Sequence, residues 1–136
     1  MSGSGFLHSY DYLGRWLSKV PRNIREPIAT TFPGAPGGGG SDHASFVAAG
    51  APAFSLSSNS WLYGSYTWHT NRDTYDKIVF DDVRSNVILT AVLAYMASED
   101  PNKTSREKIV LPVNSRTGAP GTWPPQTKPT RKGGVD

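Results

Sequence analysis

The chain of 136 residues is long enough for one modest domain with a single hydrophobic core. It contains no cysteine, which excludes disulfides and thiolate metal ligands. Its net charge of +3 is uneven: residues 1–101 carry seven basic and nine acidic side chains, and residues 102–136 carry seven and two. The basic excess therefore belongs to the C-terminal segment, which argues against nucleic-acid binding by the rest of the chain.

Two further classes are excluded by the pattern of apolar residues. No apolar run approaches the roughly 18 residues that span a bilayer, so we expect no membrane span. The first ten residues lack the basic and apolar regions of a signal peptide.

The first predicted helix covers "SYDYLGRWLSKV", residues 9–20. Its apolar side chains recur at spacings of three and four, as on one face of an amphipathic helix. Ser9 or Asp11 is the expected N-cap, and Pro21 is expected to end the helix. The next segment, "REPIATTF" at residues 25–32, is predicted to be a short strand or an extended stretch.

The segment "PGAPGGGG", residues 33–40, cannot form regular structure. It could be a flexible linker or an ordered loop whose backbone passes close to another group. We favour the ordered loop, because a short helix, "HASFVAA", follows directly behind the capping residues Ser41 and Asp42. Gly50 is expected to end that helix, and "APAFSLSS" is predicted to be a strand.

Residues 59–80 are predicted to form a long aromatic loop, and residues 81–100 the strongest helix of the chain. Asp81 and Asp82 are the expected N-cap and favour the positive end of the helix dipole. Apolar side chains cover most of the circumference of this helix. We therefore expect it to be mostly buried, against a sheet.

Residues 1–101 are predicted to form one domain portion and residues 102–136 a basic, poorly ordered tail rich in proline and glycine. Within that tail, "EKIVLPVN" could add an edge strand. The two or three short strands are too few for the sheet that the long helix requires. We therefore expect part of an α/β domain, with helices packed on a mixed or mostly parallel sheet.

Three histidines, at positions 8, 43 and 69, are the candidates for site chemistry. Their spacing matches no HExxH motif, and zinc needs three or four ligands. A triad of Ser41, His69 and Asp73 can be drawn, but no GxSxG motif accompanies it. Judged by spacing alone, His69 is a loop residue hydrogen-bonded to Asp73.

Two blocks in this order change that interpretation: "GGGGSDHASFVAAGAPAFSL", and after about a dozen residues "YTWHTNRDTYDKI" with its acidic-capped helix. Together they closely resemble the C-terminal part of zinc metallopeptidase family M-28. Co-catalytic zinc aminopeptidases and plasma glutamate carboxypeptidase belong to this family, and glutaminyl cyclases are structural relatives. The resemblance covers residues 1 to about 100.

The resemblance implies roles for four residues. His69 matches the last zinc ligand of the family, and Asp73 is the candidate to hold its imidazole. Asp42 matches an acid that lines the site. Trp68 stands where many of the aminopeptidases have a tyrosine that can donate to an oxyanion, whereas an indole donates through its N–H alone. Glutaminyl cyclases also have tryptophan there.

The resemblance also implies what the chain lacks. The family holds two zinc ions with a further histidine, two aspartates and a glutamate, and uses another glutamate as general base. Nothing in this sequence matches those residues. We therefore expect a fragment of a zinc exopeptidase, of aminopeptidase or dipeptidase type, that acts on peptides and is inactive alone.

Three further expectations concern the alternative function, the location and the self-association of the protein. The alternative function is a non-catalytic binding or interaction domain derived from the same fold. The resemblance makes a secreted or periplasmic location of the parent protein plausible, although the sequence itself does not assign one. An uncovered apolar surface predicts self-association.

Overall fold

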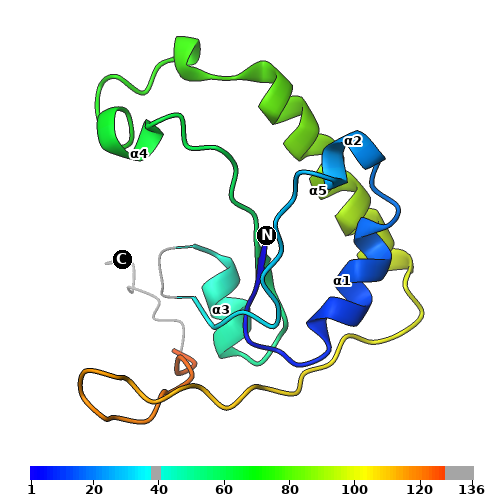
Figure 1. The fold of residues 1–136 in the computed structure, drawn as a ribbon, viewed down its shortest axis with the longest axis vertical. Helices are drawn as coiled ribbons and strands as arrows, with labels where there is room; N and C mark the ends of the chain where they lie inside the picture. Colours follow the sequence, from blue (N-terminus) through cyan, green and yellow to red (C-terminus); the bar gives the residue numbers. More distant parts are fainter. Residues whose placement is uncertain (38–40, 128–136) are drawn as a thin grey trace, which may run out of the picture. The chain divides into compact units, whose positions relative to one another are not determined.

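A computed structural model describes residues 1–37 and 41–127. The predicted order of the glycine run at residues 38–40 and the predicted disorder of residues 128–136 lie outside the described residues. The helices and strands in chain order are β1 (Ser2–Gly3), α1 (Ser9–Leu17), α2 (Arg22–Arg25), α3 (His43–Ala48), β2 (Phe54–Ser55), α4 (Tyr63–Tyr66), the 3-10 helix η1 (Tyr75–Lys77) and α5 (Phe80–Glu99) (Figure 1). This mixture of helices with a small sheet confirms the predicted α/β class.

The chain forms two compact units. Unit 1 consists of Met1, residues 11–30 and residues 56–103, and unit 2 consists of residues 2–10, 31–55 and 104–136. Each unit is held by segments that are distant in sequence. The predicted boundary at residue 101 stays a prediction.

The sheet of unit 2 is small and consists of two antiparallel strands, not the mixed or mostly parallel sheet that was predicted. β1 pairs with β2 in antiparallel register, Ser2 opposite Ser55 and Gly3 opposite Phe54. Isolated bridges extend the pairing of residues 2–6 on both sides: Ser2 with Thr31 in parallel, and Ser4 with Gly34 and Phe6 with Lys108 antiparallel. The predicted edge strand at residues 107–114 is therefore reduced to the bridge at Lys108.

Phe6 is the centre of the apolar packing in unit 2. Its side chain is fully buried, and the Trp123 ring meets it edge-on with 5.2 Å between ring centroids. The Trp123 indole donates to the carbonyl of Ile109 at 3.2 Å, and the Lys108 ammonium lies 4.7 Å from the Trp123 ring centroid. A cation over an indole face is favourable, so Trp123 joins residues 104–127 to the core of this unit.

The glycine-terminated helix of unit 2 agrees with the prediction. α3 ends at Ala48, and Gly50 follows with φ +83°. The amide of Gly50 donates to Val47 O and the amide of Ala51 to Phe46 O. These two bonds form a Schellman motif, which satisfies carbonyls that the helix end leaves open and explains the glycine.

Unit 1 is built around the apolar face of α1. Tyr12, Leu13, Trp16 and Val20 are buried, as their spacing predicts. Full burial of such a side chain contributes about 1.5–3 kcal/mol. The helix ends at Leu17, three residues early, because the amides of Lys19 and Val20 donate to carbonyls only three residues back.

Asp100 joins the end of α5 to α1. Its Oδ2 accepts from the Arg15 guanidinium at 2.7 Å and from the Trp16 indole at 2.8 Å, and its Oδ1 accepts from the amide of Asn102. The predicted N-cap role of Ser9 or Asp11 is wrong, because both lie within the helix, Ser9 as its first residue and Asp11 in its first turn. The buried Ser9 hydroxyl has no hydrogen-bond partner among the described residues.

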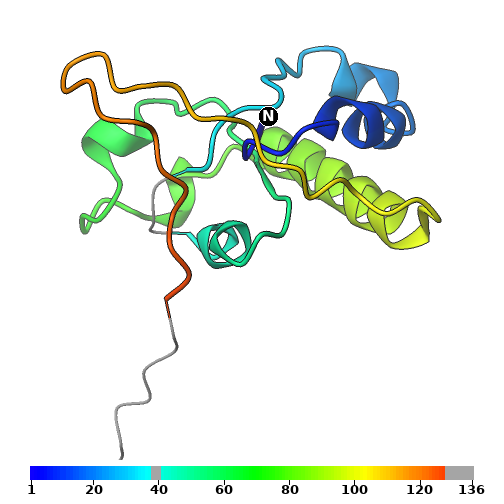
Figure 2. The ribbon, with the colours of Figure 1, turned by 90° about the horizontal axis from the view of Figure 1, so that it is seen from below.

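α5 confirms the strongest helix prediction, and α2 packs against it (Figure 2). Asp81 and Asp82 lie in its first turn, whereas Val79 takes the N-cap position. The predicted capping by Asp81 or Asp82 is therefore wrong, although both acids still complement the helix dipole. None of the described helices has the length and apolar character that a bilayer crossing requires.

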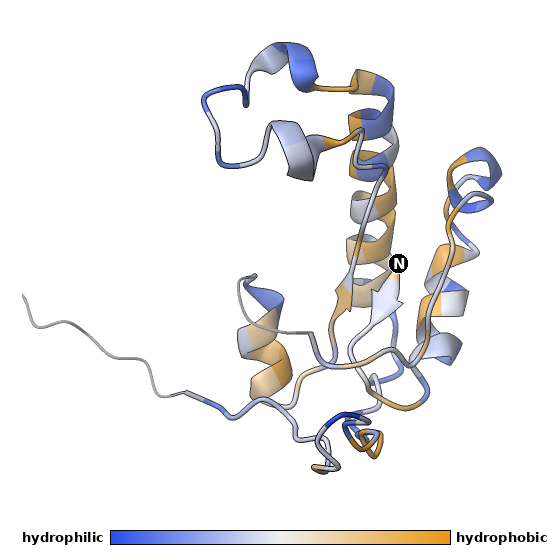
Figure 3. Cartoon of the chain, turned by 60° about the vertical axis from the view of Figure 1, so that its left-hand side comes forward, coloured by the Kyte–Doolittle hydropathy of each residue, from blue (hydrophilic) through white to orange (hydrophobic). Residues whose placement is uncertain are grey.

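The prediction that α5 is mostly buried is wrong. Leu89 and Leu93 are its buried residues, while Val83, Val87 and other apolar side chains are exposed. Apolar colour runs along most of the helix in Figure 3. The helix is apolar on two opposite sides, and the short α2 covers only part of one side.

The aromatic segment 59–80 was predicted to be a long loop, but it is not a continuous loop. It contains the single turns α4 and η1. Leu62 precedes α4 with φ +61°, in the left-handed region, and the amides of Tyr66 and Ser65 donate to its carbonyl. The turn therefore depends on backbone bonds that no apolar periodicity marks.

Candidate functional site

The loop of residues 67–73 in unit 1 carries three of the four predicted site residues. It leaves α4 at Thr67, a buried threonine whose amide donates to Tyr63 O. The Thr70 hydroxyl donates to Thr67 O at 2.7 Å and accepts from the amide of Arg72 at 3.1 Å. These bonds close the chain into a tight turn, with Trp68 and His69 at its exposed tip.

His69 has φ +59°, in the left-handed region that β-carbon sterics disfavour. Its ring stacks on that of Trp68, with 4.0 Å between centroids and 28° between planes. Both side chains are exposed. The indole therefore supports one face of the imidazole, while the edge of the ring remains accessible to a ligand.

Asp73 bonds to a different residue from the one expected. Its Oδ2 accepts from the Tyr63 hydroxyl at 2.6 Å, and the structure has no hydrogen bond between Asp73 and His69 in the described residues. This bond, with the negative charge of Asp73, raises the pKa of Tyr63 because it stabilises the protonated phenol. The expected role of Asp73 beside a zinc-bound imidazole stays a prediction.

A second carboxylate follows the loop at Asp76. It accepts from the ammonium of Lys77 and from the Thr74 hydroxyl. The Lys77 bond, followed by the Thr74 bond, lowers the pKa of Asp76 to about 2. Asp76 is therefore ionised at neutral pH.

Asp42 lies in unit 2, at the start of α3. Its dihedral angles, φ −57° and ψ −35°, are helical, and its side chain makes no capping hydrogen bond. The capping interpretation is therefore wrong, because a capping oxygen reaches the first turn from extended backbone. The carboxylate is exposed, and its predicted position beside a substrate stays a prediction.

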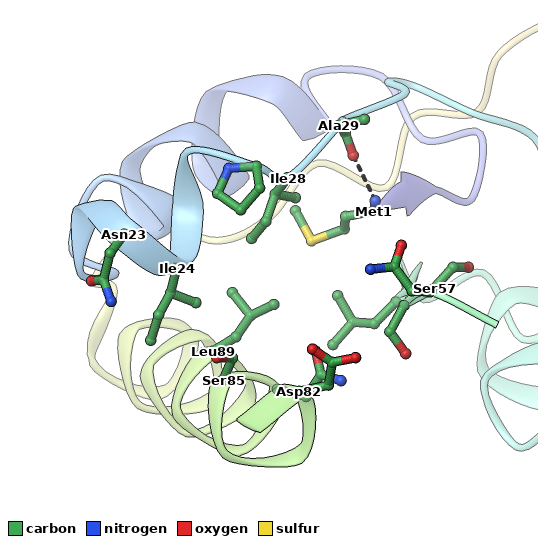
Figure 4. Close-up of a pocket in the computed structure, with 14 residues that line it drawn as sticks. Met1, Asn23, Ile24, Ile28, Ala29, Ser57, Asp82, Ser85 and Leu89 are labelled. Atoms are coloured by element: carbon green, nitrogen blue, oxygen red, sulfur yellow. Dashed lines mark hydrogen bonds between the residues drawn. The ribbon is translucent and has the colours of Figure 1, made fainter. Parts of the chain in front are cut away.

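Two hollows adjoin the N-terminal half of α5 in unit 1. One, of about 480 Å³, is lined by apolar side chains such as Ile24, Ile28 and Leu89 together with Asp82 and several serines and asparagines (Figure 4). The other, of about 560 Å³, borders α4 and includes Tyr63 and Thr67. None of the four predicted site residues lines either hollow.

The described residues do not bring together the donors of a complete zinc site. A catalytic zinc needs three protein ligands, and a structural zinc needs four. Among residues 1–37 and 41–127, no three His, Asp or Glu side chains gather closely enough to hold a metal ion. The imidazole of His69 suits zinc as one ligand, but the described side chains do not fit a complete zinc site.

The helices and the small sheet are consistent with part of an α/β peptidase domain. The model of Peptidase family M28 matches residues 7–95, and the chain belongs to this family. The matched span includes Asp42, Trp68, His69 and Asp73. Comparisons with curated proteins and with solved structures gave no match.

As a member of this family, the protein belongs to the hydrolases of the metallopeptidase type. M28 peptidases are generally zinc-dependent. The family prediction made from the two sequence blocks is confirmed.

The residues that shape the loop could not be predicted from the sequence. Tyr63, Thr67 and Thr70 hold Asp73 and the turn beneath His69. Threonine three residues after another threonine is a weak hint of the turn, because its hydroxyl can bond back to a backbone carbonyl. No pattern pointed to the bond between Tyr63 and Asp73.

Proposed function

We propose that this chain is the part of a zinc-dependent exopeptidase that supplies one zinc ligand, His69, and part of the substrate pocket. The observation that carries the proposal is the M28 match over residues 7–95, which contains every residue assigned to the site. The reaction class is hydrolysis of a peptide bond next to a chain end. The substrate is a peptide.

The geometry of the loop supports His69 as a ligand. Its imidazole lies at an exposed turn and stacks on the Trp68 ring. The hydrogen bond from the Thr70 hydroxyl to Thr67 O closes the turn that carries it. A ligand fixed in this way loses little side-chain freedom when it binds a metal. The remaining ligands would come from residues other than those the structure describes, because no three-ligand group exists among the latter.

Trp68 and Asp42 complete the proposed assignment. Trp68 orients the His69 ring and offers one indole N–H donor, which suits a substrate oxygen. Asp42 offers a carboxylate that suits the amino group or an amide of a peptide. Each therefore acts on the substrate or on the ligand, without itself reacting.

A non-catalytic binding domain derived from the M28 fold is the second candidate function. The observation in its favour is the missing three-ligand group in the described part of the chain. The two candidates differ in what they demand of His69. If His69 is a zinc ligand, it must bind the metal more tightly than His8 and His43 do. A non-catalytic binding domain requires no such difference among the three histidines.

The test is a zinc titration of the whole chain, followed by the nitrogen resonances of all three imidazoles. We expect His69 to respond first, with weak affinity, on the order of a millimolar Kd, as for a lone ligand. His8 and His43 are internal controls, and His69→Ala should abolish the first response. A parallel assay measures release of amino acids or dipeptides from short peptides.

Two results would contradict the proposal. An equal response of the three histidines would remove the zinc role of His69 and favour the binding domain. Tight binding that His69→Ala leaves intact would place the metal elsewhere. Tight binding abolished by His69→Ala, with peptide hydrolysis, would instead mean that the chain completes a catalytic site itself.

A further inference from the structure

The two hollows of unit 1 share part of their lining, and Asp82 lies where they meet. Ser58, Asn59, Asp82 and Asn86 line both of them. All of the lining residues belong to unit 1. The two hollows are therefore parts of one depression beside the N-terminal half of α5.

The first hollow combines an apolar lining with one acidic side chain. Ile24 and Ile28 are half-buried and Leu89 is buried. Figure 4 shows Asp82 on the α5 side of the hollow and Ile28 across from it. The volume of about 480 Å³ lies in the range of about 300–1,000 Å³ that small-molecule sites occupy. The hollow therefore suits a small ligand that is apolar over most of its length.

Asp82 is oriented by a hydrogen bond and has no cation in contact. Its Oδ2 accepts from the Trp61 indole at 2.9 Å, and no ion pair joins it to a residue that the structure describes. Asp100, by contrast, is paired with Arg15. Because the Asp82 side chain is half-buried, water screens its charge less than that of an exposed carboxylate. A cation from solution can therefore gain from contact with it.

The other charged groups around the depression leave Asp82 accessible to such a cation. Asp76 and Lys77 line the second hollow but are paired with one another. The Met1 ammonium lines the first hollow and donates to a backbone carbonyl on the opposite side (Figure 4). Arg84, the basic residue nearest to Asp82 along α5, lines neither hollow. The positive end of the helix dipole amounts to only about half a charge.

We propose that this depression binds a small organic cation with an apolar tail, its ammonium group against Asp82 and its tail along Ile28 and Leu89. An ammonium group has three N–H donors, and the Asn59 and Asn86 amide oxygens of the shared lining are further acceptors for it. His69 lines neither hollow, so this site is separate from the proposed zinc ligand.

The hexylammonium ion is the probe, and 1-hexanol is its uncharged counterpart of the same length. For ligands of this size we expect a Kd on the order of a millimolar for hexylammonium. The charge should make it bind at least ~5-fold more tightly than 1-hexanol, as for a partly buried ion pair. Sodium chloride keeps the ionic strength constant, because salt screens the carboxylate.

The measurement is a nuclear magnetic resonance titration of the whole chain. The Trp61 indole N–H reports on the site directly, because it donates to Asp82. The indoles of Trp16 and Trp123, which donate to Asp100 and to a backbone carbonyl, are internal references. We expect the Trp61 resonance and the amide of Leu89 to shift together, and both references to stay in place.

Asp82→Asn tests the charge with little change of size. It should weaken hexylammonium binding at least ~5-fold and leave 1-hexanol binding unchanged. Asp81→Asn is the matched control, because Asp81 lies in the same first turn of α5 but lines neither hollow. Circular dichroism confirms that both variants fold. His69→Ala should leave the hexylammonium affinity unchanged, which separates this test from that of the proposed zinc ligand.

Three results would overturn the proposal. The first is an unshifted Trp61 resonance up to about 50 mM hexylammonium, well above the expected Kd. The second is equal affinity for hexylammonium and 1-hexanol, which would remove the role of the charge. The third is equal weakening by Asp82→Asn and Asp81→Asn, which would reduce the effect to the general charge of the helix end.

Discussion

Leu93→Ala removes Cγ and both Cδ carbons from the core of unit 1. Leu93 is 2% exposed and is one of the two buried residues of α5. Truncation of a buried leucine costs about 2–5 kcal/mol, from lost transfer free energy and from the cavity left behind. We expect about 3 kcal/mol, because a helix with an open second side can shift to fill part of the cavity.

Leu62→Ala is the matched control for this prediction. It removes the same atoms in the same unit, but Leu62 is 63% exposed. An exposed truncation should change the free energy of unfolding by no more than about 0.5 kcal/mol. The difference between the two variants therefore isolates burial from side-chain chemistry.

Urea unfolding of both variants can be followed by far-ultraviolet circular dichroism, because α5 is the longest helix among the described residues and gives a large part of the helical signal. With an unchanged slope, the lower midpoint of Leu93→Ala gives its free-energy loss. Equal midpoints for the two variants would show that Leu93 does not lie in a core. They would refute the assignment of the inner face of α5.

Three shorter predictions follow from single contacts. The bonds from Arg15, Asn102 and Trp16 hold the pKa of Asp100 well below its usual 3.8. Because the folded-state pKa is lowered, the carboxylate contributes stability above pH 3.8, and this contribution is lost as the pH falls below that value. Asp100→Asn should therefore flatten the acid side of the profile of stability against pH, measured by urea unfolding. Gly34→Ala should unfold unit 2, because the added Cβ would lie 2.0 Å from Gly3 O. Gly50→Ala is the control: its Cβ would meet open space, so it should cost only the ~1–2 kcal/mol of a left-handed backbone. Thermal melts of the two variants measure the difference. Asp73→Asn should lower the pKa of Tyr63, measured by a nuclear magnetic resonance titration of its ring carbon; an unchanged value would refute the Tyr63–Asp73 bond.

Local patterns in the sequence predicted what depends on neighbouring residues. The spacing of Tyr12, Leu13 and Trp16 predicted α1 and its buried face, and Gly50 predicted the end of α3. α5 was predicted within one residue at each end. The order and spacing of the two blocks around Asp42 and His69 predicted the family. All of these properties depend on backbone geometry or on motifs within a short stretch of chain.

Contacts between distant residues were decided by the tertiary structure alone. Ser2 and Gly3 form the central strand of unit 2 because Thr31, Gly34 and Phe54 pair with residues 2–4, and no alternation of apolar residues marks them. Apolar residues all round α5 indicated burial, yet the packing covers only one side. Asp73 bonds to Tyr63 because α4 brings the phenol within reach. A residue pattern specifies which side chains can be buried or bonded, whereas their partners are chosen by how the whole chain folds.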